Sequence, residues 1–187
     1  MVKEKDAVSL SRQDWIALGL SVLAESGIGA VRVEPLAKQL HVTKGSFYWH
    51  FKNREELLEA VLQAWIDRQT NSIIGQVEAI EGDASAKLLY LFELAVQDNG
   101  QIENAIRAWA VNDARVAKIL EQVDQRRLKY TQSLFLEIGF SPFNALVRAR
   151  MVYYSLVGEF TIGTRSNQEE RLVEIRLQHS ILTRQDL

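Results

Sequence analysis

Apolar side chains recur three and four positions apart along almost all of this 187-residue sequence, and that spacing constrains the fold more than any other feature. Residues so spaced lie on one face of an α-helix. The chain holds two prolines, Pro35 and Pro142, and each stands where a helix is expected to begin, a position at which a missing N–H costs nothing. With ten glycines besides, little material remains for a turn-rich β architecture. We therefore expect an all-α protein.

Breaks in this periodicity divide the chain into helices. Ser11 and Asp14 form a variant of the capping box at the start of the first helix, and Gly27 suits the position just after its end. From such signals we predict about nine helices, at 11–26, 33–40, 44–50, 53–75, 83–98, 102–111, 114–138, 142–163 and 168–183. The segment 142–163 is apolar on nearly every face, so we expect it to be covered on all sides.

The segment VTKGSFYWHFKNREELL, residues 42–58, concentrates aromatic rings and cationic groups. Four of its rings fall within five positions, although the whole chain is 9% aromatic. Over residues 32–54, five basic residues stand against one acidic residue, a local charge of +4 in a chain whose net charge is −2. A confined phosphate-binding face would look like this. A chance cluster of solvated charges remains the alternative.

The helices predicted at 33–40 and 44–50, preceded by a bracing helix, have the spacing of a helix-turn-helix motif. Thr43 is placed to cap the second of them. Lys44 follows at the helix start, where a long cation can reach guanine acceptors or a phosphate. Gly45 is small, so this helix can approach base edges and backbone closely.

The aromatic residues of this helix divide between two faces. Phe47 and Phe51 lie four positions apart, so they share one face and would pack inward. Tyr48 and Trp49 then point away, where a phenol and an indole N–H can each donate to a phosphate oxygen. Burial of Tyr48 and Trp49 in the core is the alternative.

The run AESGIGAVRVEPLAKQLHVTKGSFYWHFKNREELL, residues 24–58, resembles the N-terminal domain of the TetR family of transcriptional regulators. The resemblance is carried by the Val-Thr-Lys-Gly-Ser-Phe-Tyr pattern from Val42 onward, with Phe51 following. Two positions depart from the family pattern: Val33 stands where Thr or Ser is common, and Arg54 stands in a slot usually held by Lys.

This resemblance implies an all-α homodimer with a three-helix helix-turn-helix DNA-binding domain at 9–55. A helical ligand-binding and dimerisation domain would follow at 56–187. The protein would be a cytoplasmic repressor that binds a palindromic operator in double-stranded DNA and is released by a small molecule. A protein effector, or no effector at all, is the alternative that the sequence leaves open.

The candidate DNA-binding residues surround the second helix of the motif. They are Arg32, Val33, Thr43, Lys44, Gly45, Ser46, Tyr48, Trp49, His50, Lys52 and Arg54. His50 could instead pack beneath the helix, and Arg32 could be a solvated charge. Lys52 and Arg54 flank the start of the following helix, whose free N–H groups themselves favour anions.

The last two predicted helices are the candidates for dimerisation, because an intersubunit four-helix arrangement would cover their apolar faces. The expected interface residues are Leu146, Arg150, Tyr153, Val157, Leu172, Ile175, His179 and Leu182. Burial of both helices inside a monomer is the alternative.

Aromatic residues of the C-terminal part are numerous enough to line a pocket for a small apolar or aromatic ligand. The candidates are Trp65, Tyr90, Phe92, Trp109, Tyr130, Phe135, Tyr153 and Tyr154. Ordinary core packing would account for the same residues.

Several classes of function lack their signatures. The chain has no cysteine, three histidines, no glycine-rich phosphate loop, no HExxH and no serine-centred elbow, so we expect neither an enzyme nor a metal or cofactor site. No apolar run is long enough to span a bilayer, and we expect no signal peptide because the N-terminal residues contain no apolar core. A helical enzyme remains a distant alternative.

Overall fold

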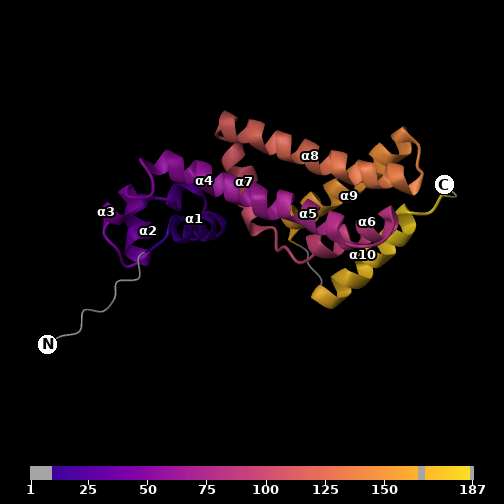
Figure 1. Cartoon of the computed structure of the whole chain (residues 1–187), viewed down its shortest axis with the longest axis horizontal. Coiled ribbons are helices and arrows are strands. Elements are labelled where there is room, and N and C mark those ends of the chain that lie inside the picture. The colour runs from indigo at the N-terminus through magenta and orange to yellow at the C-terminus, as the bar shows by residue number, and fades with distance from the viewer. Residues whose placement is uncertain (1–9, 164–166, 186–187) are drawn as a thin grey trace. The chain divides into compact units, whose positions relative to one another are not determined.

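The computed structural model describes residues 10–163 and 167–185, in which all regular structure is helical (Figure 1). The α-helices are α1 (Arg12–Ser26), α2 (Val33–Gln39), α3 (Lys44–Tyr48), α4 (Arg54–Ile66), α5 (Ser72–Ala79), α6 (Ala84–Ala95), α7 (Gln101–Ala110), α8 (Ala114–Ile138), α9 (Pro142–Ile162) and α10 (Gln168–Leu182). The π-helical segment Asp67–Asn71 connects α4 to α5 without a break in helical backbone, so apart from the 3-10 helix Ile28–Ala30 the described residues contain nine continuous helical segments. The all-α prediction is confirmed.

The chain divides into two compact units, Met1–Trp65 and Ile66–Leu187. The predicted boundary between a DNA-binding domain at 9–55 and a ligand-binding and dimerisation domain at 56–187 stays a prediction. In the N-terminal unit, the capping box forms as expected, since Ser11 Oγ accepts from the backbone N–H of Asp14 while Asp14 accepts from the N–H of Ser11. Helix α1 then buries Trp15 and Leu23 completely.

Helices α2 and α3 are held together by the turn between them. The N–H of Val42 donates to the carbonyl of Ala37 at 2.9 Å, and His41 adopts a left-handed conformation with φ of 57°. The predicted capping role of Thr43 is wrong in one respect. Thr43 is the residue before α3, but its side chain makes no capping hydrogen bond, and its carbonyl accepts from Ser46 instead.

The spacing of the buried residues changes between α4 and α5. On α4 the buried residues recur at helical spacing as far as Trp65, and the next buried residue is Thr70, five positions later. The π-helical segment Asp67–Asn71 accommodates this extra residue, because a π turn holds one residue more than an α turn. Helix α5 ends at Ala79, four residues beyond the end predicted for the helix at 53–75.

In the C-terminal unit, α8 packs against α6, α7 and α9, and α10 packs against α6. Leu88, Leu134 and Phe135 are almost completely buried in this core. Helix α9 presents Ala145 and Ala149 to it, and small residues of this kind permit close approach of helices.

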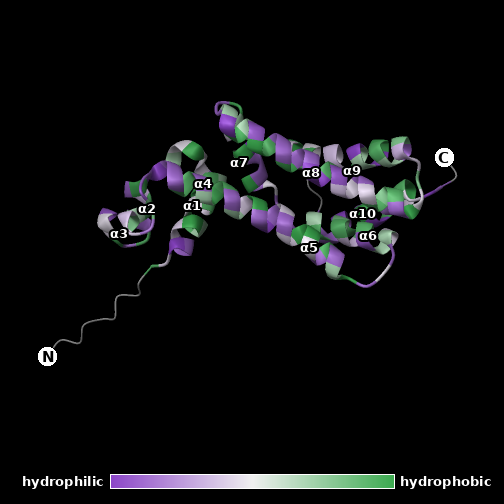
Figure 2. Cartoon of the chain, turned by 45° about the horizontal axis from the view of Figure 1, so that its top comes forward, coloured by the Kyte–Doolittle hydropathy of each residue, from purple (hydrophilic) through white to green (hydrophobic). Residues whose placement is uncertain are grey.

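The described residues of the chain leave one side of α9 uncovered, so the cover expected on every side would have to include a second protomer. Its exposed apolar residues are Phe143, Val147, Met151, Tyr154 and Ile162, and those of α10 are Val173, Leu177 and Ile181. Hydropathy colouring shows hydrophobic residues recurring along both helices (Figure 2). Each set follows helical spacing, so each helix has an apolar stripe that no described residue covers.

Candidate DNA-binding surface and ligand cavity

Helix α3 and the turn that follows it have a buried side and an exposed side, as the spacing of their rings predicts. Phe47 is completely buried and Phe51 is 2% exposed. The Phe47 ring meets that of Trp15 edge to face, with centroids 5.2 Å apart, so α3 is anchored on α1. Tyr48 is 61% exposed and Trp49 is 88% exposed. An indole this exposed contributes little to folding and is available to bind a partner.

Lys44, at the first position of α3, pairs with Glu34 of α2. Both side chains are more than half exposed, so the pair adds little stability. The hydrogen bond and positive charge of Lys44 lower the pKa of Glu34. Lys44 therefore stands at the predicted position, but a carboxylate competes with DNA for its ammonium group.

Two of the predicted phosphate contacts are engaged with the protein backbone. His50 Nε2 lies 2.9 Å from the carbonyl oxygen of Leu10. Arg54 donates from Nε to the carbonyl of Val31 at 2.6 Å and from Nη2 to that of Ile28 at 2.8 Å. Both side chains thus stabilise the connections around α1. The structure favours the packing alternative for His50 and gives Arg54 a structural role that its sequence context did not predict.

The remaining candidate residues around α3 differ in accessibility. Arg32, Thr43, Gly45 and Lys52 are exposed, whereas Val33 and Ser46 are partly buried. Next to Lys52, Asn53 Oδ1 accepts from the N–H of Glu56 and so caps α4, as the sequence predicts. Together with Lys44, Tyr48 and Trp49, these four exposed residues form the candidate DNA-binding surface. Their contacts with DNA stay predictions.

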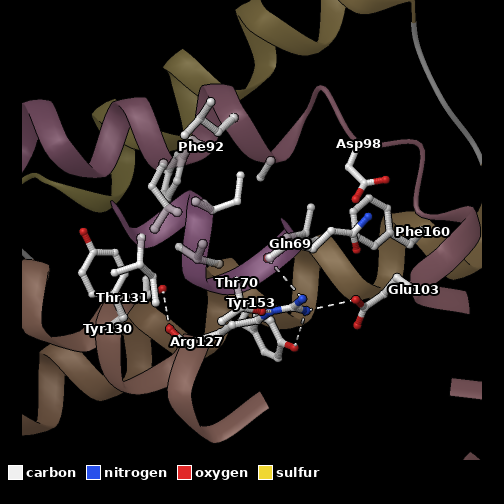
Figure 3. A pocket seen from close by; sticks show the side chains of 17 residues that line it. Gln69, Thr70, Phe92, Asp98, Glu103, Arg127, Tyr130, Thr131, Tyr153 and Phe160 are labelled. Carbon is white, nitrogen blue, oxygen red and sulfur yellow. Dashed lines mark hydrogen bonds and ion pairs between the residues drawn. The ribbon is translucent and has the colours of Figure 1, made fainter. Parts of the chain in front are cut away.

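The C-terminal unit contains a cavity of about 130 Å³ (Figure 3). It is lined by Gln69, Thr70, Ile73, Ile74, Leu91, Phe92, Leu94, Ala95, Asp98, Glu103, Arg127, Tyr130, Thr131, Val152, Tyr153, Leu156 and Phe160. Most of these side chains are apolar, and the charged ones gather toward one end. A mostly apolar concavity with a few polar groups is the usual form of a small-molecule site.

Arg127 connects the cavity wall to the π-helical segment. It donates to Thr70 Oγ1 at 3.0 Å and to the carbonyl of Gln69 at 3.3 Å, and it pairs with Glu103 Oε2 at 3.0 Å. Its Nη1 also lies 3.5 Å from the hydroxyl of Tyr153 (Figure 3). Burial disfavours its charge, but the charges and hydrogen bonds of Glu103 and Tyr153 together outweigh that effect and raise its pKa, so Arg127 stays cationic.

Behind this wall the network continues to a second arginine and a second carboxylate. Arg107 pairs with Glu103 at 2.7 Å and with Asp124 at 2.8 Å. Tyr153 donates to Asp124 at 2.6 Å, and burial together with this carboxylate raises the pKa of Tyr153. Two guanidinium groups therefore neutralise two carboxylates, and the Tyr153 hydroxyl stays protonated.

Three of the eight residues predicted for the pocket line this cavity: Phe92, Tyr130 and Tyr153. The other five, Trp65, Tyr90, Trp109, Phe135 and Tyr154, do not line it. Phe135 belongs to the core, and Tyr154 is 59% exposed because it follows the inward-facing Tyr153 by one residue, about 100° around α9. The charged lining residues were not predicted; the one available signal was the spacing of Glu103 and Arg107 on α7.

The predicted dimer interface is displaced by about one position from the exposed stripes. Tyr153, Ile175 and Leu182 are buried within the chain, while Leu146, Val157, Leu172 and His179 are partly buried and Arg150 is exposed. His179 Nε2 lies 2.9 Å from the carbonyl of Ser85, which ties α10 to α6. Helices α9 and α10 do carry uncovered apolar surface, but most of the residues that form it stand next in sequence to the residues predicted for the interface.

Two classes of site are absent from the part of the chain that the structure describes. No three histidine, aspartate or glutamate side chains there come together in a group that could hold a metal ion. Within the same residues, no helix has the length and apolar character needed to cross a bilayer.

Residues 16–61 match the family model for bacterial regulatory proteins of the tetR family. The class G tetracycline repressor of Vibrio anguillarum is 28% identical over 167 residues, which cover 87% of this chain and 73% of the repressor. The transcriptional regulator AcuR of Cereibacter sphaeroides is 39% identical over 57 residues, 30% of this chain and 26% of that regulator. The fold matches a regulator from Saccharomonospora viridis solved with choline, with a TM-score of 0.73 at 15% identity over 88% of this chain and 93% of that one.

Proposed function

Because this chain belongs to the TetR family of bacterial regulatory proteins, we propose that it is a homodimeric repressor of transcription, acting in the cytoplasm. Its DNA-binding domain would read a palindromic operator, and a small molecule in the C-terminal cavity would release it. Helix α3 and the turn after it carry this proposal, because their aromatic residues split into an anchored pair and an exposed pair. Phe47 packs on Trp15 of α1 and Phe51 lies beneath Arg12 of α1, and this leaves Tyr48 and Trp49 exposed for DNA.

Affinity for DNA would come mainly from phosphate contacts made by the cations and hydrogen-bond donors around α3. Lys52 and Arg32 are exposed, and Lys44 becomes available when a phosphate replaces Glu34 as its partner. Binding of this kind releases counterions and weakens steeply as salt rises. Two-fold symmetry of the protein would match two-fold symmetry of the operator, with half-sites one helical turn apart.

The operator can be found by selecting bound duplexes from a random pool, and the selected duplex then serves in a gel retardation assay. We expect the double variant Lys44→Ala, Tyr48→Ala to lose retardation while keeping its circular dichroism spectrum. Lys118→Ala is the matched control, since Lys118 is an exposed cation on α8. Unchanged retardation by the double variant would show that α3 is not the DNA-binding helix.

Dimerisation is supported by the uncovered stripes of α9 and α10. Met151 is 56% exposed and Leu177 is 59% exposed, and a second copy of the chain would bury both stripes in a four-helix arrangement. Met151→Asp should therefore shift the protein from dimer to monomer in sedimentation velocity. Val111 is 81% exposed but lies outside the stripes, so Val111→Asp should leave the dimer intact. A Met151→Asp protein that remains dimeric would exclude this interface.

The cavity supports release by a small molecule. The regulator of similar fold from Saccharomonospora viridis was solved with choline, which concerns that protein's own site. In this chain, Arg127 bridges the cavity wall and the carbonyl of Gln69 in the π-helical segment. A ligand that displaces this contact would change the π-helical segment, which directly follows α4 in the chain. Direct competition between ligand and operator in the retardation assay tests this step.

A further inference from the structure

The charges that line the cavity do not cancel. Asp98 and Glu103 are carboxylates, and Arg127 is the one basic residue among the lining residues. Arg127 is already matched to Glu103, and behind the wall Arg107 and Asp124 balance each other. Of the three carboxylates Asp98, Glu103 and Asp124, Asp98 is therefore the one without a cationic partner.

Asp98 is available to a ligand. Its Oδ1 accepts one hydrogen bond, from the backbone N–H of Gly100 at 2.8 Å, and no lysine, arginine or histidine of the described residues pairs with it. Figure 3 shows Asp98 beside Phe160 at the end of the cavity that also holds Glu103. A carboxylate that is solvated in the empty cavity would lose its water when a ligand fills the space, and that loss is costly unless the ligand replaces the water with a compensating group.

An anionic ligand fits this cavity poorly. Arg127, its only candidate anchor on the wall, already contacts four oxygen atoms, from Thr70, Gln69, Glu103 and Tyr153. An anion would have to share this guanidinium with those four acceptors and would then lie near two carboxylates, Asp98 and Glu103. A neutral ligand avoids repulsion but leaves Asp98 desolvated.

A cationic ligand meets favourable groups over most of the wall, and the charge of Arg127 is balanced by Glu103. The charge of the ligand would compensate Asp98, and its apolar part would contact side chains such as Leu91, Val152 and Leu156. The rings of Phe92 and Phe160 also border the cavity, and aromatic rings attract cations through their faces. A volume of about 130 Å³ suits a body near the size of one benzene ring, since a cavity of roughly 150 Å³ can hold benzene.

We propose that this cavity selects small organic cations, each with one protonated or quaternary amine bound at Asp98 and an apolar body of about one ring. This inference rests on the proposed ligand-responsive function and specifies the chemical class of its effector. It makes the repressor a sensor of amphipathic amines, and it assigns to Asp98 the choice between cations and anions.

Three probes that share one ring but differ in charge test the proposal on the full chain. At pH 7, 2-phenylethylamine is a cation, 2-phenylethanol is neutral and 3-phenylpropanoate is an anion. Ligands that bind the folded state raise the melting temperature, and isothermal titration gives the dissociation constant. We expect binding in the order cation, neutral, anion. Asp98→Asn keeps the acceptor for Gly100 but removes the charge, and it should weaken amine binding about tenfold or more.

Glu81→Gln is the matched control, because Glu81 is an exposed carboxylate that does not line the cavity, and it should bind the amine as the wild type does. Equal or tighter binding of 3-phenylpropanoate, an unchanged amine affinity in Asp98→Asn, or no binding of any probe would each overturn the proposal. Operator retardation by the same preparation reports on the DNA-binding function separately, so a failure of ligand selection is not mistaken for a failure of that function.

Discussion

Gly100 offers a direct test of how tightly the cavity wall is packed. A Cβ atom at this position would lie 2.4 Å from two ring atoms of Phe160, which lines the cavity. Gly100 also has a left-handed backbone, with φ of 70° and ψ of 3°. Gly100→Ala must therefore carry both backbone strain and a steric clash with a ring that is 7% exposed.

The two costs can be separated with Gly163, which has nearly the same backbone, φ of 71° and ψ of 8°, but no atom of the described residues within 4 Å of an added Cβ. The left-handed conformation costs an alanine about 1–2 kcal/mol. Forcing an extra carbon into a packed region costs about 1–3 kcal/mol more. We expect Gly163→Ala to lose about 1–2 kcal/mol of unfolding free energy and Gly100→Ala about 2–5 kcal/mol.

Urea unfolding followed by circular dichroism measures both values, since the midpoint falls with stability while the slope reports any change in compactness. The difference between the two variants gives the cost of displacing Phe160. If the two variants lose the same stability, the close packing of Phe160 against Gly100 is refuted, and the cavity boundary at that end is looser than described.

Three further predictions concern the N-terminal unit. A lysine at position 54 can reach only one of the two carbonyls that Arg54 binds, so Arg54→Lys should lose about 1–3 kcal/mol of unfolding free energy in urea. The folded variant should still retard DNA. A variant of unchanged stability would contradict the structural role of Arg54. Glu34→Gln frees Lys44, so operator binding should tighten and its salt dependence should steepen, and identical salt slopes would count against a phosphate contact by Lys44. Hydrogen bonds from Ser11 lower the pKa of Asp14 below the ordinary value of an aspartate, so its contribution to stability is present above that ordinary value and is lost as pH falls through the lowered pKa. The wild type and Asp14→Asn should therefore differ at pH 7 and converge at strongly acidic pH in urea titrations, and a constant difference would contradict the coupling.

Helix positions and the anchoring of α3 could be predicted because they follow from local spacing. The capping box at Ser11, the start of α9 at Pro142 and the inward pair Phe47 and Phe51 each depend on residues within four positions of one another. Such signals act before any tertiary contact forms, so one sequence is enough to find them.

Partners distant in sequence could not be predicted in this way. Arg54 binds carbonyls 23 and 26 residues away, and Arg127 reaches Thr70 across 57 residues. The exposed apolar residues of α9 and α10 differ from those predicted to face a partner subunit, such as Leu146 and Ile175. In a segment where nearly every position is apolar, the sequence does not say which residues face the chain's own core.

The π-helical segment has a consequence for recombination between relatives. Because a π turn holds one residue more than an α turn, deleting one residue between Trp65 and Thr70 would turn the helix that follows by about 100° about its own axis. DNA-binding domains could therefore be exchanged among regulators only at junctions that preserve the number of residues from Trp65 to Thr70. The length of this short segment, more than its composition, would decide whether a chimaeric regulator folds.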